Sequence, residues 1–194
     1  PSHGYREVFR QLLPQLADGT LVVSAVKGIE VDSGMTMTEI MDEENKGRKR
    51  LHFCVLSGPS FAAEVADCQP TAVTAACVDP EAAEQVQQLF AAEYFRVYAA
   101  SDVKGLEISS AMKNVIAIGA GICDGLGYGL NTRAALITRG LAEIARMGVA
   151  MGAQPQTFAG LGGLGDLVLT CTGDLSRNRT VGLKLGSGLT LEEV

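Results

Sequence analysis

Lys113 lies inside an apolar stretch that runs from Asp102 to Gly121. The apolar residues around it recur at three- and four-residue steps, as Ile108, Met112 and Ile116 show. This spacing predicts a helix that is apolar over most of its circumference and therefore buried. Burial disfavours the charged form of a lysine and lowers its pKa, so Lys113 is a candidate proton donor or acceptor near neutral pH.

A structural role for Lys113 is the simpler interpretation, and it is the commoner one for a lysine in a buried helix. The ammonium group would then reach solvent or pair with a carboxylate. The next residue, Asn114, favours a functional role, because two adjacent polar side chains in an apolar run need partners in the interior. A polar substrate is one such partner.

A glycine- and serine-containing turn, S-G-P-S-F-A, follows the predicted strand at 51–56. Gly58 permits close backbone approach, Pro59 fits a first helical turn, and Ser60 supplies a hydroxyl beside free amide groups. Ligands of open α/β sheets bind at such carboxyl ends of strands. A plain capped turn explains the same residues equally well.

Residues 160–165 match the pattern G-x-G-x-x-G literally. The dinucleotide-binding fingerprint requires a strand before this pattern and an acidic residue at the end of a second strand about twenty residues later. The flanking residues predict neither strand, so we reject the match. We expect a tight glycine turn that leads into a helix starting at Asp166, with Thr170 one turn later on the same face. Asp166 is also typical of an ordinary helix start.

A third polar cluster, Ser176-Arg177-Asn178-Arg179, combines two fixed cations with hydroxyl and amide donors at a predicted helix start. Guanidinium groups match the oxygens of a phosphate dianion, and oriented amide groups add to them. Such a set suits a phosphate group, although taken alone it is more often surface basicity.

The elements that would position these residues fall into two parts. Strands are predicted at 20–26, 51–56, 71–77 and 95–98, and helices at 5–16, 37–44 and 80–90. This alternation predicts a mostly parallel sheet covered by helices. After residue 102 only helices are predicted, around Lys113, at 132–147, within 156–172 and from 177. We place a domain boundary at about 102, between an α/β domain (1–102) and a helical domain (103–194).

The composition is that of an ordinary soluble globular sequence, with 47% hydrophobic and 20% charged residues. The net charge of -6 predicts no general affinity for nucleic acid or anionic membranes, and the basic run at 46–50 is expected to be a solvated loop. The apolar run at 116–122 is too short for stable membrane insertion. The five cysteines are odd in number and form no C-x-x-C pair, so we expect reduced thiols in a cytoplasmic protein, without a disulfide frame or a metal site.

The two ends of the sequence suggest an internal piece of a longer protein. The chain begins P-S-H-G-Y without a methionine. It closes on T-L-E-E-V, where Thr190 followed by Glu192 and Glu193 has the pattern of a capped helix start.

Five motifs, in this order, resemble those of bacterial NAD(P)-dependent glycerol-3-phosphate dehydrogenases. They are A-V-K-G-I-E (25–30), S-G-P-S-F-A (57–62), A-M-K-N-V-I-A-I-G-A-G (111–121), G-L-G-G-L-G-D-L-V-L-T-C (160–171) and S-R-N-R (176–179). The resemblance spans nearly the whole chain. It implies a Rossmann-type parallel sheet followed by an all-helical substrate domain like the C-terminal domain of 6-phosphogluconate dehydrogenase.

The same resemblance implies a role for each matching residue. Lys113 would exchange the proton at the carbinol oxygen, and Lys27 would contact both the nicotinamide cofactor and the substrate. Gly58 and Ser60 would lie at the substrate, and Ala62 against the cofactor. The other residues expected at the substrate site are Asp166, Ser176, Arg177 and Asn178, with Arg177 and Asn178 on the phosphate, Arg177 also near the cofactor, and Asn114 and Thr170 in support.

The implied reaction interconverts sn-glycerol 3-phosphate and dihydroxyacetone phosphate with NADP or NAD and feeds glycerophospholipid synthesis. A homodimer is compatible with it. The family's glycine-rich loop and first strands are not among the motifs found, and neither is the residue that selects NAD or NADP. We therefore expect this chain alone to bind cofactor poorly and to turn over little substrate.

Two other functions are compatible with the sequence. One is a hydroxy-acid dehydrogenase with the same two-domain plan, which would leave the cluster at 176–178 unexplained. The other is a non-catalytic assembly module, in which Lys113 is structural and keeps a normal or raised pKa.

Overall fold

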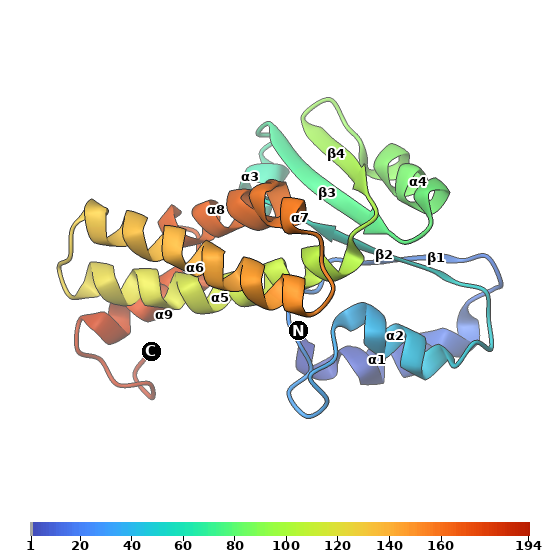
Figure 1. Cartoon of the computed structure of the whole chain (residues 1–194), viewed down its shortest axis with the longest axis horizontal. Helices are drawn as coiled ribbons and strands as arrows, with labels where there is room; N and C mark the ends of the chain where they lie inside the picture. The colour runs from blue at the N-terminus through green and yellow to red at the C-terminus, as the bar shows by residue number, and fades with distance from the viewer. Residues whose placement is uncertain (1) are drawn as a thin grey trace.

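The computed structural model describes residues 2–194, in which a four-stranded sheet with its helices adjoins a group of packed helices (Figure 1). The first part contains α1 (Tyr5–Leu12), β1 (Leu21–Ser24), α2 (Met37–Asn45), β2 (His52–Ser57), α3 (Ala62–Ala66), β3 (Thr71–Cys77), α4 (Pro80–Phe90) and β4 (Phe95–Ala100). The second contains α5 (Val103–Gly125), α6 (Leu130–Ala150), α7 (Pro155–Ala159), a π-helical turn (Leu161–Gly165), α8 (Asp166–Thr172) and α9 (Arg177–Gly186). The predicted alternation of strands and helices, and the helices after it, are confirmed.

The sheet has the strand order β1-β2-β3-β4, and its central pair is antiparallel. The outer pairs β1–β2 and β3–β4 are parallel, so the prediction of a mostly parallel sheet holds for two of the three pairings. The exception is the β2–β3 pair, whose connection contains α3 and begins at Gly58 with φ +151°, a conformation that favours glycine. A Cβ atom at Gly58 would lie 2.9 Å from the Cα atom of Val73 on β3, so glycine permits this close return.

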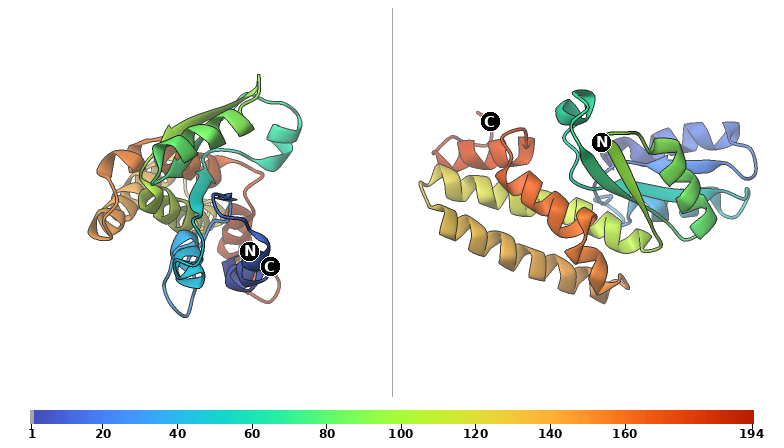
Figure 2. Two further views of the ribbon diagram at one scale, coloured as in Figure 1. Left: turned by 90° about the vertical axis from the view of Figure 1, so that its right-hand side faces the viewer. Right: turned by 90° about the horizontal axis from the view of Figure 1, so that it is seen from above.

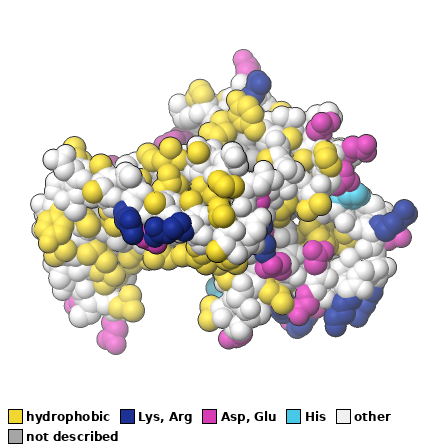
Figure 3. All heavy atoms as spheres, in the orientation of Figure 1, with side chains coloured by type: hydrophobic (Ala, Val, Ile, Leu, Met, Phe, Trp, Pro, Cys, Tyr) yellow, Lys and Arg dark blue, Asp and Glu magenta, His cyan; other side chains and the backbone are white. Residues whose placement is uncertain are grey.

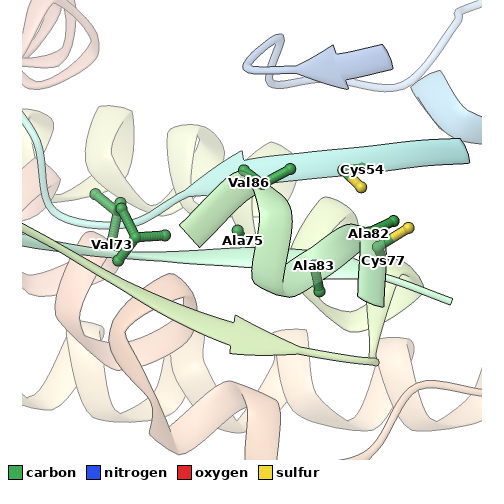
Figure 4. Packing of buried hydrophobic residues seen from close by; sticks show 8 residues of the cluster. Cys54, Val73, Ala75, Cys77, Ala82, Ala83 and Val86 are labelled. Atoms are coloured by element: carbon green, nitrogen blue, oxygen red, sulfur yellow. The ribbon is translucent and has the colours of Figure 1, made fainter. Parts of the chain in front are cut away.

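Separate apolar clusters cover the two faces of the sheet. On one face α4 packs on β2, β3 and β4 through small and β-branched residues, namely Cys54, Val73, Ala75, Cys77, Ala82, Ala83, Val86 and Val97 (Figure 4). On the other face Val55 and Ala76 meet Val103 and Leu106 from the first turns of α5. Since α5 both covers the sheet and continues into the helical part, it fixes how the two parts meet.

Charged side chains gather over α1 and α2, whereas the visible face of the helical part is largely apolar (Figure 3). The basic run at 46–50 is only partly the solvated loop that we expected. Lys49 turns inward, and its ammonium group donates to the carbonyl oxygens of Leu13 and Pro14, 2.8 and 3.1 Å away, beyond the C-terminus of α1. A cation is favourable at the carbonyl end of a helix.

Helix α5 lies between α6 and α9 (Figure 2). By length and composition this helix is apolar enough to cross a membrane, and it is much longer than the run at 116–122 considered above. In the folded chain 56% of its most apolar window is buried inside the protein. This is the character of a central core helix, which passes the same test.

Glycine residues bring the backbones of α5 and α9 into direct contact. A Cβ atom at Gly121 of α5 would lie 2.0 Å from the carbonyl oxygen of Arg179, and one at Gly182 of α9 would lie 2.0 Å from that of Ile118. Gly125 and Gly186 repeat this arrangement one turn further along. The start of α9 is thereby held beside the middle of α5.

We expect Gly121→Ala to destabilise the fold by about 1–3 kcal/mol, because the added methyl group would press on backbone atoms that cannot rotate away. Gly119→Ala on the same helix is the matched control. Its Cβ atom would meet only the Leu136 side chain at an ordinary 3.6 Å, and alanine favours the helix. Urea unfolding of both variants measures the difference. Equal stabilities would contradict the close contact between α5 and α9.

Candidate active site

One buried carboxylate joins two lysine side chains. The ammonium group of Lys113 donates to Asp166 Oδ1 at 2.8 Å, and that of Lys27 donates to Asp166 Oδ2 at 2.7 Å. Lys113 also donates to the Thr170 hydroxyl at 2.6 Å. The three charged groups come from different elements, namely the segment after β1, the middle of α5 and the first residue of α8.

The glycine turn at 160–165 positions Asp166. Helix α7 precedes this turn where the dinucleotide fingerprint would need a strand, so the rejection of the G-x-G-x-x-G match is confirmed. A Cβ atom at Gly162 would lie 2.0 Å from Leu106 Cδ1, which shows how closely the turn packs on α5. The Thr170 hydroxyl donates to the Asp166 carbonyl oxygen at 2.6 Å and so keeps a lone pair for Lys113.

Burial lowers the pKa of Lys113 below its ordinary value, since the residue is only 6% exposed. The neighbouring Asp166 carboxylate acts in the opposite direction, and the charge of Lys27 lowers the pKa further. A lysine whose only role is an ion pair would keep a normal or raised pKa. The direction of the shift brings the amine and ammonium forms of Lys113 closer in free energy.

A cavity of about 890 Å³ lies over this cluster. Its lining includes all but one of the predicted site residues: Lys27, Ser60, Ala62, Lys113, Asn114, Asp166, Thr170, Ser176, Arg177 and Asn178. The exception is Gly58, which is buried behind the lining and whose carbonyl oxygen accepts a hydrogen bond from the Ser60 hydroxyl at 3.1 Å. Apolar side chains that the sequence did not single out, Val26, Phe61, Leu169 and Leu175, complete the walls.

The two arginines at the start of α9 have different surroundings. Arg177 is exposed at the cavity, and its side chain forms no hydrogen bond or ion pair within residues 2–194. Arg179 instead binds the carboxylates of Asp124 and Asp174, at 2.9 and 2.8 Å. The expectation of two cations for one phosphate is therefore wrong for Arg179, because Asp124, 55 residues earlier, and Asp174, five residues earlier, neutralise it.

Two polar contacts orient the residues around Arg177. Ser176 caps α9, with its hydroxyl oxygen accepting from the amide of Arg179 at 3.2 Å. The Asn178 side chain donates to the Asn114 side-chain oxygen at 2.9 Å. This amide pair links the start of α9 to the residue that follows Lys113.

Sequence reasoning missed Glu107, a carboxylate that is 3% exposed and lies six residues before Lys113 on the same helix. A charged residue within the apolar run was the sequence signal that could have identified it. Over residues 2–194 no group of three or more His, Cys, Asp or Glu side chains is placed to hold a metal ion, and the five cysteines are unpaired. A second cavity of about 780 Å³ contains none of the predicted site residues.

Comparisons with known proteins give the same family for both parts of the chain. Residues 1–83 match the family model described as NAD-dependent glycerol-3-phosphate dehydrogenase N-terminus, and residues 102–194 match its C-terminus counterpart. The protein from Geobacter metallireducens named glycerol-3-phosphate dehydrogenase (NAD(P)+) is 63% identical over 194 residues, which are all of this chain and 58% of that protein. The chain thus spans little more than half the length of this relative.

Solved structures show the same similarity. The crystal structure of glycerol-3-phosphate dehydrogenase from Coxiella burnetii superposes with a TM-score of 0.94 at 40% identity, covering 100% of this chain and 58% of that one. The glycerol-3-phosphate dehydrogenase from Saccharomyces cerevisiae superposes with a TM-score of 0.82 at 29% identity, covering 95% of this chain and 55% of that one.

We expect Asp166→Asn to lower the pKa of Lys113 further, because the substitution removes the negative charge that favours the ammonium form. Lys27→Met should raise that pKa, because it removes a neighbouring positive charge. NMR titration of a ¹³Cε-labelled Lys113 measures both shifts, with circular dichroism to show that each variant is folded. Shifts of the same sign in the two variants would contradict the proposed electrostatics.

Proposed function

The chain belongs to the NAD-dependent glycerol-3-phosphate dehydrogenase family, and we propose that it forms the substrate side of an enzyme that interconverts sn-glycerol 3-phosphate and dihydroxyacetone phosphate with NAD or NADP. One observation carries the proposal. A buried lysine with a lowered pKa shares a cavity with an exposed arginine that has no ion-pair partner among residues 2–194, so a proton-exchanging group and a phosphate-binding group face the same space.

Lys113 exchanges the proton at the carbinol oxygen of the substrate. Oxidation of the alcohol requires a base for its hydroxyl proton, and in the reverse direction the same group donates a proton to the carbonyl oxygen. A bound nicotinamide would accept or supply the hydride. The lowered pKa of Lys113 suits both directions, because the amine and the ammonium form are then closer in free energy near neutral pH.

Lys27 and Asp166 set the electrostatic environment of the carbinol oxygen of the substrate. Two ammonium groups around one carboxylate leave a net positive charge at a buried position, which stabilises negative charge developing on the substrate. Asp166 holds both ammonium groups, and the Thr170 hydroxyl directs Lys113.

Arg177 and Asn178 bind the phosphate of the substrate. The guanidinium group offers a fixed positive charge, and binding at this remote group can orient the reacting carbon beside Lys113. The pair of Asn178 with Asn114 keeps the phosphate end at a set distance from the acid–base end. Ser176 supports both residues by capping their helix.

Lys27, Ala62 and Arg177 would contact the nicotinamide end of the cofactor. Their surroundings fit such a group, because the cavity is larger than a three-carbon phosphate requires and Ala62 leaves its rim open. Within residues 2–194 no glycine-rich turn joins a strand to a helix in the manner of a dinucleotide phosphate loop. These residues therefore account for the reacting end of the cofactor alone.

The structure suggests further details of the whole protein. We place the domain boundary at about residue 102, where β4 has ended and α5 begins. Unpaired cysteines fit the reducing cytoplasm, and sn-glycerol 3-phosphate made there would enter glycerophospholipid synthesis. A homodimer without stable membrane insertion is the expected assembly.

The test uses a full-length chimera, in which this chain replaces the matching span of the Geobacter metallireducens relative. We expect dihydroxyacetone phosphate-dependent oxidation of NADH or NADPH, and a loss of about 10²–10⁴-fold in turnover for Lys113→Ala. Lys46→Asn is the control, because it lies in an exposed loop with φ 49°, a conformation that asparagine tolerates. This chain alone should turn over little or no substrate.

Near-normal turnover of the Lys113→Ala chimera would remove this lysine from the mechanism. An unsubstituted chimera that reduces 2-keto acids but not dihydroxyacetone phosphate would support a hydroxy-acid dehydrogenase instead. A folded chimera that reduces neither would leave the non-catalytic assembly role.

For Arg177→Met we expect KM for dihydroxyacetone phosphate to rise about 10- to 100-fold, since a charge-assisted hydrogen bond contributes about 1.5–3 kcal/mol. Unphosphorylated dihydroxyacetone should be reduced equally well by the variant and the parent. Arg139→Met serves as control, because that side chain is 70% exposed on α6 and pairs only with Glu143. Equal losses with both substrates would contradict phosphate binding by Arg177.

A further inference from the structure

Glu107 is a buried carboxylate that the proposed reaction does not use. It accepts hydrogen bonds from the backbone amide and the hydroxyl of Thr38, at 2.8 and 2.6 Å. Burial raises its pKa, and the bonds from the threonines of this segment act in the opposite direction. A buried carboxylate held by two donors in another element fixes the two elements to each other.

The two donors lie in the first turn of α2. Thr36 caps this helix and Glu39 completes the capping box, so the amide of Thr38 is one of the free N–H groups at the helix start. Glu107 satisfies that amide from outside the helix. Lys104, one turn earlier on α5, forms an ion pair with Glu39. Two side chains of α5 therefore hold the first turn of α2.

The start of α2 is bound in turn to the segment that carries Lys27. Thr36 forms an isolated antiparallel bridge with Ile29, and the Glu30 amide donates to the Met35 carbonyl oxygen at 2.9 Å. Ile29 is two residues beyond Lys27. A displacement of the first turn of α2 would therefore pull on the backbone next to Lys27.

Arg6 strengthens the same segment from α1. Its guanidinium group binds both carboxylate oxygens of Glu30, at 2.8 and 2.6 Å, and holds the pKa of that carboxyl at about 2. The segment is thus held by Arg6 of α1 and, through the first turn of α2, by Glu107. Glu107 belongs to α5, the helix that carries Lys113.

We propose that Glu107 is a positioning residue that holds the Lys27 ammonium group in its cluster with Asp166 and Lys113. Glu107 and Lys113 lie six residues apart on α5, a rise of about 9 Å along one continuous helix. The helix that carries the acid–base lysine therefore also sets the place of the second lysine. The proposal rests on the proposed function for its catalytic meaning.

The pKa of Lys113 reports the position of Lys27, because the nearby charge of Lys27 lowers it. If Glu107→Gln lets Lys27 move away, the pKa of Lys113 must rise. A substitution that merely loosens the fold would leave the folded-state pKa of Lys113 where it was. The readout thus separates positioning from a general loss of stability.

The experiment titrates ¹³Cε-labelled Lys113 by NMR in the full-length chimera. We expect Glu107→Gln to shift its pKa upward, in the direction of Lys27→Met, and to lower kcat about 10- to 100-fold with little change in KM. Asp124→Asn is the matched control, because it also neutralises a carboxylate on α5, one whose side chain is 7% exposed, but lies at the far end, bound to Arg133 and Arg179. It should leave the pKa of Lys113 unchanged.

An unchanged pKa of Lys113 in a folded but less stable Glu107→Gln variant would overturn the proposal, and so would an equal shift in Asp124→Asn. If Glu107→Gln does not fold, Thr38→Val removes only the hydroxyl donor and must still give a smaller upward shift. No shift in that variant would overturn the proposal. Because the titration needs no turnover, a chimera inactive on dihydroxyacetone phosphate would refute the proposed function without deciding the role of Glu107.

Discussion

The carboxylate of Asp166 accepts hydrogen bonds from two ammonium groups, and the arrangement of the site depends on this shared anion. At 2% exposure, such a group is stable only when its charge is compensated by close partners. The partners lie 139 and 53 residues earlier in the sequence, so the carboxylate joins the segment after β1, α5 and α8. With one anion between two cations, the cluster attracts negative charge, which suits a substrate oxygen.

Small residues make this cluster geometrically possible. The turn before Asp166 approaches α5 so closely that a methyl group at Gly162 would overlap the Leu106 side chain. Nearer the C-terminal end of α5, Gly121 and Gly182 allow the backbones of α5 and α9 to touch. The close approach of both neighbours places Asp166 and Arg177 at one cavity, and larger residues would separate them.

Local pattern was sufficient to predict the elements and the central lysine. The spacing of Ile108, Met112 and Ile116 predicted the buried helix, and an unusual polar residue within it identified Lys113. The helix predicted at 80–90 coincides with α4, which Asp79 caps and Pro80 begins. Each of these features depends on residues within a few positions of one another.

Features that depend on distant pairing were not predictable in this way. The antiparallel pairing of β3 with β2 involves a close approach of Gly58 to Val73, and the neutralised state of Arg179 depends on Asp124, 55 residues earlier. Glu107 accepts its hydrogen bonds from Thr38 in α2, 69 residues earlier, a pairing that no local pattern indicates. Lys27 was predicted as a site residue only through the resemblance of whole motifs. No local pattern distinguishes it from any other lysine that follows a strand.

Asp102 lies at the junction between the two parts of the chain and holds several elements together. It caps α5 by accepting from the Gly105 amide at 2.9 Å, and its other oxygen accepts from the Gln154 amide at 2.9 Å and from the Thr157 hydroxyl. One carboxylate thus ties the start of α5 to α7, and α7 leads through the glycine turn to Asp166. Glu107 ties the next turn of α5 to the first turn of α2, and Thr36 at the start of α2 bridges to Ile29, two residues beyond Lys27. Contacts from α5 therefore reach both of the chain segments that supply the charged partners of Lys113.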